Sequence, residues 1–392
     1  MKFLEIFFWF AAFVVFYTYL GYGLLLYGLV KIKRFFTRNK PVFAYEVLPE
    51  VTLFITAWNE ESVIKGKMKN CRALNYPKDK LKIYWVTDGT TDSTNEKLST
   101  YPEVILQYSP ERLGKTAAMT RGMKFVTTPL VVFTDANTFL NADSIRIIVN
   151  RFADPKVGCV AGEKRVMQQA KDQAVSSGEG FYWKYESKLK TWDDELHSVV
   201  GAAGELFAIR THLFEEMPKD TLLDDFILSL RIVQKGYKTA YTPDAYAEET
   251  SSAAMFEEEK RKVRIAAGGL QSIWRLRSLL NVFKYGVLSF QYISHRVLRW
   301  TLTPVLLFLL LPINVALVVW MPESSIYLVI LILQGLFYLA GHAGKLLEKR
   351  KIRFKLLFIP YYFIFMNICV FKGVKYLMKK RSNGAWERAR RA

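Results

Sequence analysis

Apolar segments in the middle of the chain end in polar residues of types that bind nucleotides or metal ions. The stretch LVVFTDAN, residues 130–137, places Asp135 and Asn137 directly after a run of apolar residues. Desolvating a carboxylate at the edge of a core costs several kcal/mol unless a partner compensates. Asp135 therefore either begins a turn where a strand stops or lies beside a cationic group, and this stretch alone leaves both interpretations open.

Strand-like and helix-like segments alternate between about residues 50 and 250. Residues 51–57, 82–88, 103–109 and 130–136 are typical of buried strands, and polar helical stretches separate them. This alternation predicts an α/β domain with a mostly parallel sheet covered on both faces. In such sheets the ligand binds beyond the carboxyl ends of the strands.

The residues at the predicted strand ends suit a nucleotide. Asn59 and Glu60 follow the first strand, Asp88 ends the second, and Arg112 and Lys115 follow the third. Any one of them is more often a turn former than a ligand, but four successive strands end in this way. Carboxylates can contact a base edge, a ribose or a metal ion, whereas cations can bind phosphate.

Several other site classes lack their signatures. The sequence contains no GxxxxGK[ST] phosphate-binding loop and no GxGxxG after a strand. The histidines are too scattered for a zinc site, so we interpret them as structural or surface groups: His197, His212, His295 and His342. The three cysteines form no CxxC pair, which suits a reducing compartment.

The ends of the 392-residue chain are typical of a membrane protein. Uncharged runs at 6–30, 301–322 and 324–344 are long enough to cross a bilayer, which takes about 20 residues. Much of the net charge of +19 follows the first and third runs, which places the middle region in the cytoplasm. This placement favours anionic lipid headgroups over nucleic acid as partners.

The topology at the C-terminal end stays open. A fourth apolar run, residues 356–371, is shorter and contains Pro360. Four full spans would put the basic tail outside the cell, whereas its charge favours the cytoplasm. A re-entrant or interfacial fourth segment would resolve the conflict.

Five motifs at the strand ends resemble those of the membrane-anchored family-2 glycosyltransferases. They are TAWNEE (56–61), VTDGTTDST (86–94), RLGKTAAM (112–119), FTDAN (133–137) and LLDDFILSLRIVQKGYKTAY (222–241). The resemblance covers roughly residues 15–300 and includes the hyaluronan, chitin, cellulose and poly-N-acetylglucosamine synthase-like enzymes. It implies a GT-A fold, which is a Rossmann-like cytoplasmic domain flanked by transmembrane helices.

The resemblance also implies a division of the chain. We expect an N-terminal anchor at 1–31, a GT-A domain at 45–265, interfacial amphipathic helices at 266–300, a C-terminal transmembrane region at 301–372 and a basic tail at 373–392. The segment 279–300 mixes aromatic and basic residues without acids, which itself suits the membrane interface.

The resemblance assigns roles to particular residues. It makes Asp225 the general base, with Asp224 as its neighbour, and it makes Asp135 and Asn137 ligands of Mg²⁺ or Mn²⁺. The residues that it implies for nucleotide-sugar binding are Thr56, Asn59, Glu60, Asp88, Arg112, Lys115, Asp135, Arg261 and Arg264. Independently of the family, the two aspartates could simply favour the N-terminus of a helix.

The chain departs from the family pattern at three places. Asn137 stands where the metal motif has its second Asp, so that ligand carries no charge. Asp224 stands where the family often has Glu. In the Gln-x-x-Arg-Trp motif of polymerising relatives, Arg261 replaces Gln and Ile265 replaces Trp, which removes an aromatic platform for a long sugar acceptor.

Two further segments are candidates for the acceptor side. In GAAGELFAIR (201–210), small residues precede a probable strand. In FYWKYESKLK (181–190), aromatic residues stand where a sugar could stack. Both patterns are also common in ordinary packing.

The expected function is transfer of a sugar from a nucleotide sugar, by default a UDP-sugar, to a lipid-linked or glycan acceptor. The expected location is the cytoplasmic face of the cell membrane, and transfer is expected to invert the anomeric centre with help from a metal. One alternative is a processive synthase that extends and exports a β-linked polysaccharide. Another is a non-catalytic membrane scaffold that binds nucleotide sugar.

Overall fold

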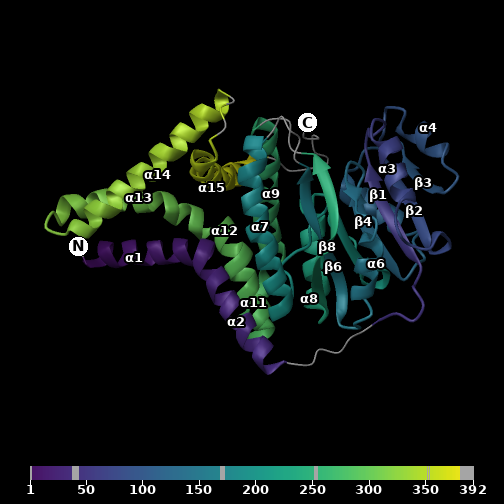
Figure 1. The fold of residues 1–392 in the computed structure, drawn as a ribbon, viewed down its shortest axis with the longest axis horizontal. Helices are drawn as coiled ribbons and strands as arrows, with labels where there is room; N and C mark the ends of the chain where they lie inside the picture. The colour runs from purple at the N-terminus through teal and green to yellow at the C-terminus, as the bar shows by residue number, and fades with distance from the viewer. Residues whose placement is uncertain are drawn as a thin grey trace.

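A sheet-containing domain lies beside a group of long helices in the computed structural model (Figure 1). The structure describes residues 2–37, 44–167, 173–250, 255–350, 352 and 354–379, and side chains of the helix that begins at Gln173 are described from Trp183 onward. The first long helix comes from the N-terminal end of the chain, and the last three come from its C-terminal end.

The described strands form one eight-stranded sheet in the order β3-β2-β1-β4-β7-β6-β8-β5. Their bounds are β1 Val51–Ala57, β2 Leu81–Asp88, β3 Val104–Ser109, β4 Leu130–Asp135, β5 Phe139–Leu140, β6 Val157–Met167, β7 Leu206–Arg210 and β8 Lys238–Thr250. The first four strands are parallel, as the sequence predicts, whereas β7 runs antiparallel to both β4 and β6. The carboxyl ends of β1, β2, β3 and β4 therefore meet at one edge.

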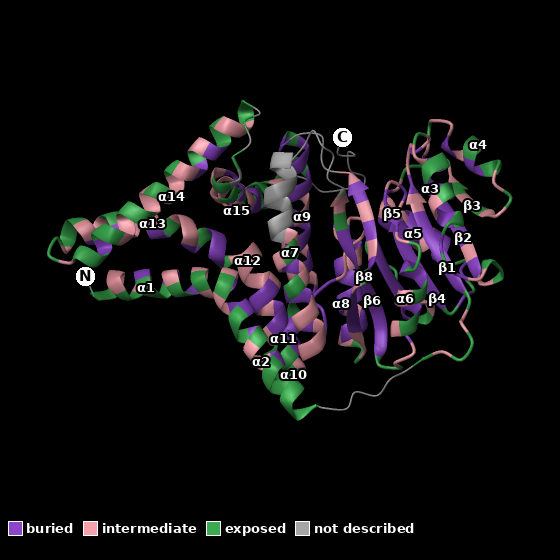
Figure 2. Ribbon diagram, viewed as in Figure 1, coloured by how far each residue is buried: buried purple, intermediate pink, exposed green. Residues whose placement is uncertain are grey.

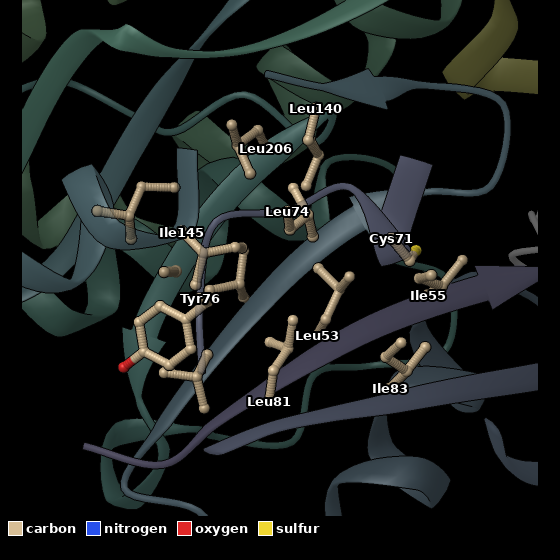
Figure 3. Close-up of a cluster of buried hydrophobic side chains, with 14 of the residues drawn as sticks. Leu53, Ile55, Cys71, Leu74, Tyr76, Leu81, Ile83, Leu140, Ile145 and Leu206 are labelled. Atoms are coloured by element: carbon tan, nitrogen blue, oxygen red, sulfur yellow. The ribbon is translucent and has the colours of Figure 1, made fainter. Parts of the chain in front are cut away.

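Helices cover both faces of the sheet, because apolar residues run almost continuously along its central strands and so point to both faces. On β1, Leu53 and Ile55 pack into one core, together with α3 Ile64–Arg72 and α6 Ser144–Arg151 (Figure 3). Phe54 points to the opposite core, which contains α5 Lys115–Met123 and α8 Asp224–Gln234. Consecutive side chains of a strand point to opposite faces, so this strand is buried on both sides.

The remaining helices fall into two groups, those that belong to or flank the sheet domain and those at the apolar ends of the chain. Those that flank the sheet domain are α4 Thr94–Ser99, α7 Gln173–Leu196, α9 Met255–Arg275, α10 Val282–Tyr285, α11 Val287–Tyr292 and α12 Leu298–Trp300. The apolar ones are α1 Lys2–Phe16, α2 Tyr22–Phe36, α13 Leu302–Trp320, α14 Ser325–Lys349 and α15 Lys355–Lys379. Helix α9 continues unbroken across the boundary expected after residue 265.

Four helical segments among the described residues are long and apolar enough to cross a membrane. They are Lys2–Phe36, Leu302–Trp320, Ser325–Lys349 and Leu356–Lys379. Their outward surfaces alternate between exposed and half-buried residues, whereas the strands are almost entirely buried (Figure 2). Exposed apolar side chains in such number are expected where lipid, not water, is the solvent.

The first apolar segment bends at a π-helical turn, η1 Tyr17–Gly21, between α1 and α2 (Figure 1). A second π-helical turn, η5 Ile293–Val297, lies against it, because Tyr17 Oη is 2.8 Å from Ser294 Oγ. The hydroxyls of Thr18 and Thr303 are also hydrogen-bonded at 2.9 Å. Such π-helical turns often occur at functional sites. The turn η1 lies at one end of the cavity described below.

Candidate active site

Lys115 joins two carboxylate groups that come from different elements. It begins α5, and its Nζ atom donates a 2.8 Å hydrogen bond to Oδ1 of Asp135 at the end of β4. Oδ2 of Asp224, the first residue of α8, is 3.8 Å from the same ammonium. Burial by itself would lower the pKa of Lys115, but these carboxylates hold that pKa above its ordinary value. Lys115 is therefore the cationic group beside Asp135, which is one of the two interpretations that the sequence left open.

Asp225 has a pKa well above the ordinary value of an aspartate. Burial and then the charge of Asp224 raise the pKa of Asp225 to about 7. Both aspartates lie in the first turn of α8, where the helix dipole favours negative charge, as the structural interpretation expects. The catalytic role of the pair stays a prediction. A Cβ atom on Gly204 would lie 3.3 Å from Oδ2 of Asp225, which shows how closely the backbone before β7 approaches this carboxylate.

Asp88 positions the loop that carries Lys115. Its Oδ2 atom accepts hydrogen bonds from the backbone N–H groups of Leu113 at 2.9 Å and Gly114 at 2.6 Å. Arg121 secures the same strand end, because its Nη2 atom donates to the carbonyl of Thr87 at 2.6 Å. The Asp88 side chain is almost completely buried by these contacts.

The other predicted nucleotide ligands lie at the same strand edge. Thr56 is paired in register with Asp135. Asn59 adopts a φ of 52°, which Asn tolerates better than most residues, and its Oδ1 accepts from the Thr91 backbone at 2.8 Å. The Arg112 guanidinium lies 3.4 Å from the centre of the Trp58 ring.

Glu60 lies beside Asn59 at that edge, and its backbone N–H donates to Thr94 Oγ1 at 2.9 Å. Thus Thr56, Asn59, Glu60 and Arg112 gather beyond the carboxyl ends of the strands, but they do not line the cavity that contains Asp225.

That cavity has a volume of about 690 Å³ and extends from the aspartates into the apolar helices. Six predicted site residues line it: Lys115, Asp135, Asp224, Asp225, Arg261 and Arg264. Its far wall is apolar and comes from η1 and α15, for example Tyr19, Leu20, Tyr362 and Phe363. A substrate that reaches Asp225 through this cavity would therefore pass between segments that can span a membrane.

Arg261 is held by a neighbouring acid on α9. Its Nε and Nη2 atoms each donate to a different Glu258 oxygen at 2.9 Å, which is a bidentate pair. Arg264 lies one turn further along the helix and also lines the cavity, together with Ile265. The replacement of an aromatic residue by Ile265 therefore leaves an aliphatic side chain in the cavity wall.

Sequence reasoning missed Glu205 as a charged part of the cavity. It follows Gly204 directly, in the motif GAAGELFAIR, whose small residues are its more conspicuous feature. Glu205 forms an ion pair with the buried Lys164, which also contacts Glu249 at 2.5 Å. Burial would raise the pKa of Glu205, but the Lys164 ammonium holds it well below its usual range.

Two tryptophans line the same cavity, although neither lies in the motif that the family uses. Trp183 comes from α7, inside the segment considered for sugar stacking, and Trp300 comes from α12. Trp300 packs edge-on against Phe226, next to the proposed base, with ring centres 5.4 Å apart. Trp274, which is close to the altered motif in sequence, is largely exposed instead.

A second buried ionic cluster joins α7 to the apolar helices. Asp193 accepts hydrogen bonds from Tyr22 at 2.5 Å and from Gln291 at 2.9 Å, and His295 Nδ1 lies 2.6 Å from its Oδ2. The other ring nitrogen of His295 faces Glu186, which also pairs with Arg296 at 2.6 Å. The prediction that His295 is a structural group agrees with its complete burial here.

Asp135 and Asn137 offer oxygen atoms of the kind that a hard cation binds. Within the described ranges, no three His, Cys, Asp or Glu side chains are grouped as a ready metal site. Mg²⁺ or Mn²⁺ bound with substrate needs only one or two carboxylates, since phosphate and water supply the other ligands. No described residue forms a hydrogen bond with the buried Oδ2 atom of Asp224, so the acidic cluster retains capacity for a cation. The donor set therefore fits such an ion.

Comparison with known proteins identifies the sheet domain. Residues 49–268 match the family model described as "Glycosyltransferase like family 2". The chain is similar to the poly-beta-1,6-N-acetyl-D-glucosamine synthase of Staphylococcus aureus strain COL, with 24% identity over 265 residues, and to the probable glycosyltransferase YdaM of Bacillus subtilis strain 168, with 27% over 266 residues. Each alignment spans 64% of this chain and 62% of the relative.

A solved structure shares the fold over nearly the whole chain. The mannosyltransferase PcManGT from Pyrobaculum calidifontis, in complex with GDP-Man and Mn²⁺, superimposes with a TM-score of 0.67. The match covers 95% of this chain and 99% of that one, at 19% identity. The expected GT-A fold, flanked by apolar helices at both ends, is confirmed. The chain belongs to glycosyltransferase family 2.

Proposed function

We propose that this protein transfers a sugar from a nucleotide sugar to a lipid-linked or glycan acceptor at the cytoplasmic face of the cell membrane. The observation that carries the proposal is one cavity that contains Asp225, Lys115 and Asp135 at one end and apolar, span-like helices at the other. Such a cavity lets a water-soluble donor and a membrane-associated acceptor meet at the same carboxylate.

The proposed reaction is a displacement at the anomeric carbon. Asp225 takes the proton of the acceptor hydroxyl while that oxygen attacks the anomeric carbon from the face opposite the leaving group. The bond between the anomeric carbon and the diphosphate oxygen breaks, and the electron pair leaves with the nucleoside diphosphate. One new glycosidic bond forms, and the configuration of the sugar is inverted.

The remaining site residues hold the donor. Lys115, Arg112, Arg261 and Arg264 are the proposed diphosphate partners, because guanidinium and ammonium groups bind phosphate oxygens. Thr56, Asn59, Glu60 and Asp88 are proposed to shape the nucleoside end of the site. Asp135 and Asn137 would hold Mg²⁺ or Mn²⁺, which when bound neutralises charge on the departing diphosphate.

A panel of nucleotide sugars tests the proposal. The full chain in lipid nanodiscs is incubated with UDP-sugars and with GDP-mannose, and the released nucleoside diphosphate is measured with and without Mn²⁺ or Mg²⁺. A UDP-sugar is the proposed donor, and release should require the divalent ion. Binding without release of nucleoside diphosphate from any donor would support the non-catalytic scaffold instead.

A processive synthase is the second candidate. Two observations favour it: the cavity continues between apolar helices, and one relative is a polysaccharide synthase by name. The altered residues at 261 and 265 favour a single transfer. Electrophoresis of the products separates the two, since a ladder of lengthening glycans would require processive addition.

A further inference from the structure

Lys190 is a buried lysine that lines the cavity, and within the part of the chain that the structure describes its ammonium forms no ion pair. This residue lies on α7, is only 3% exposed, and lines the cavity. Its Nζ atom lies 5.9 Å from the centre of the Trp183 ring and 5.6 Å from that of Tyr241. Among the described residues, no carboxylate oxygen lies within 4 Å of this Nζ atom. The Glu163 carboxylate is further away, and the charge of Lys190 partly offsets the rise that burial causes in the pKa of Glu163.

The neighbouring ammonium groups make this arrangement unusual. Lys164 and Lys262 also lie 5.8 Å from the centre of the Trp183 ring, so three buried lysines surround one aromatic side chain. Lys164 is neutralised by Glu205 and Glu249, and Lys262 lies 3.5 Å from Glu258. Only the Lys190 charge lacks such a carboxylate among these three described lysines.

A buried ammonium is unfavourable unless it has a counter-charge, and cation–π contacts compensate only in part. A ligand that brings a negative group into the cavity would supply that counter-charge. Trp183 beside it offers a flat apolar face of the kind on which a sugar ring packs. The two side chains are seven residues apart on α7, which puts them on the same side of the helix.

The acceptor end of the cavity is the place for this ligand. Lys164 connects the two regions, because it pairs with Glu205 and also lies beside Trp183. Glu205 is close enough to Asp225 to raise the pKa of that proposed base. The predicted nucleoside ligands lie at the strand edge outside the cavity, and the diphosphate partners proposed above do not include Lys190.

We propose that Lys190 and Trp183 form an oxyanion-binding acceptor subsite, and that the acceptor is a saccharide carrying a negative group. Calling the ligand an acceptor rests on the proposed function. The oxyanion is either the carboxylate of a uronic acid or the phosphate that joins a sugar to a lipid. The subsite also supplies an aromatic face in place of the one lost at Ile265.

Soluble disaccharides test the subsite without turnover. The full chain in nanodiscs is titrated with cellobiose, cellobiouronic acid and cellobiose 1-phosphate, and binding is followed by saturation-transfer difference NMR against empty nanodiscs. At least one charged probe should bind about tenfold more tightly than cellobiose, as expected for a charge-assisted contact. The two charged probes distinguish a uronate from a phosphate.

Substitutions at Lys190 provide the decisive comparison. Lys190→Met should abolish the preference for charged probes, and Lys190→Arg should keep it. Trp183→Leu should lower the affinity for all three disaccharides. Lys188→Met is the matched control, because Lys188 is an exposed lysine on the same helix and its loss should change nothing. UDP and GDP affinities, measured on the same samples, should be equal in wild type and Lys190→Met.

Three results would overturn the subsite: equal or absent binding of charged and neutral probes, a preference that survives Lys190→Met, or nucleotide affinity that falls with it. A fall in nucleotide affinity in Lys190→Met would show that Lys190 binds the donor instead of the acceptor. Because the titration needs no turnover, an inactive wild-type protein contradicts the proposed function, whereas a missing charge preference contradicts the subsite.

Discussion

Lys115 lies 2.8 Å from Asp135, and this contact connects the start of α5 to the carboxyl end of β4. The two residues are 20 positions apart in the chain and meet because Lys115 follows β3 and Asp135 ends β4, two strands of the same parallel part of the sheet. Asp224 completes the group from α8. One half-buried ammonium thus holds together the residues proposed to bind diphosphate, to bind metal and to take the acceptor proton.

Lys115→Met should disable the site. Without the ammonium, Asp135, Asp224 and Asp225 repel one another in a buried place, and a lost buried partner costs about 3–5 kcal/mol. We expect nucleoside diphosphate release to fall at least about 100-fold and the melting temperature to drop. Lys124→Met is the control, since Lys124 is exposed just after the same helix. Equal losses in both variants would contradict a specific role for Lys115.

The pH dependence should follow the protonation of Asp225. A base must be deprotonated, and burial and Asp224 raise the pKa of Asp225 to about 7. The rate at low donor concentration should therefore fall about tenfold per pH unit below about pH 7. Asp224→Asn removes the neighbouring charge and should move this midpoint to lower pH. A midpoint that stays in place in Asp224→Asn would argue against the coupling of the two carboxylates.

Gly204→Ala should crowd the proposed base. The new Cβ atom would lie 3.3 Å from Asp225 Oδ2, so this carboxylate must shift by a few tenths of an ångström, whereas Lys115 Nζ at 3.7 Å is in ordinary contact. Transfer should fall about tenfold while the fold is retained, because small misplacements of reacting groups are costly. Gly335→Ala, which meets no atom within 4 Å, is the matched control. Full activity in Gly204→Ala would show that the approach is not functionally important.

The strand ends could be predicted from the sequence, because the apolar runs that stop at Asp88 and Asp135 have the length and composition of buried strands. The observed strands begin and end within about a residue of those expectations. Which side chains share a cavity could not be predicted. Lys164 and Glu205 are 41 positions apart, and only the antiparallel β6 and β7 bring them together.

The buried ionic cluster around His295 could not be predicted for the same reason. Its members come from α2, α7, α11 and η5, and each has an ordinary local sequence. The Lys190 ammonium was likewise indistinguishable in sequence from the exposed Lys188, because helical phase alone does not say what covers a face.

His295→Leu should destabilise the contact between α7 and the apolar helices. The imidazole lies between Asp193 and Glu186, and its loss would leave two buried carboxylates without that partner. We expect a destabilisation of about 3–5 kcal/mol, seen as a lower melting temperature in nanodiscs. His342→Leu removes an exposed histidine from α14 and should leave that temperature unchanged. An unshifted melting temperature in His295→Leu would contradict a structural role for the cluster.

The most direct measurement compares Asp225→Asn with wild type for both nucleotide binding and sugar transfer. Asp244→Asn, at an exposed position on β8, controls for the loss of one acidic group. If Asp225 is the base, transfer should fall at least about 1,000-fold while nucleotide affinity stays within about twofold. Transfer at the wild-type rate in Asp225→Asn would contradict the account.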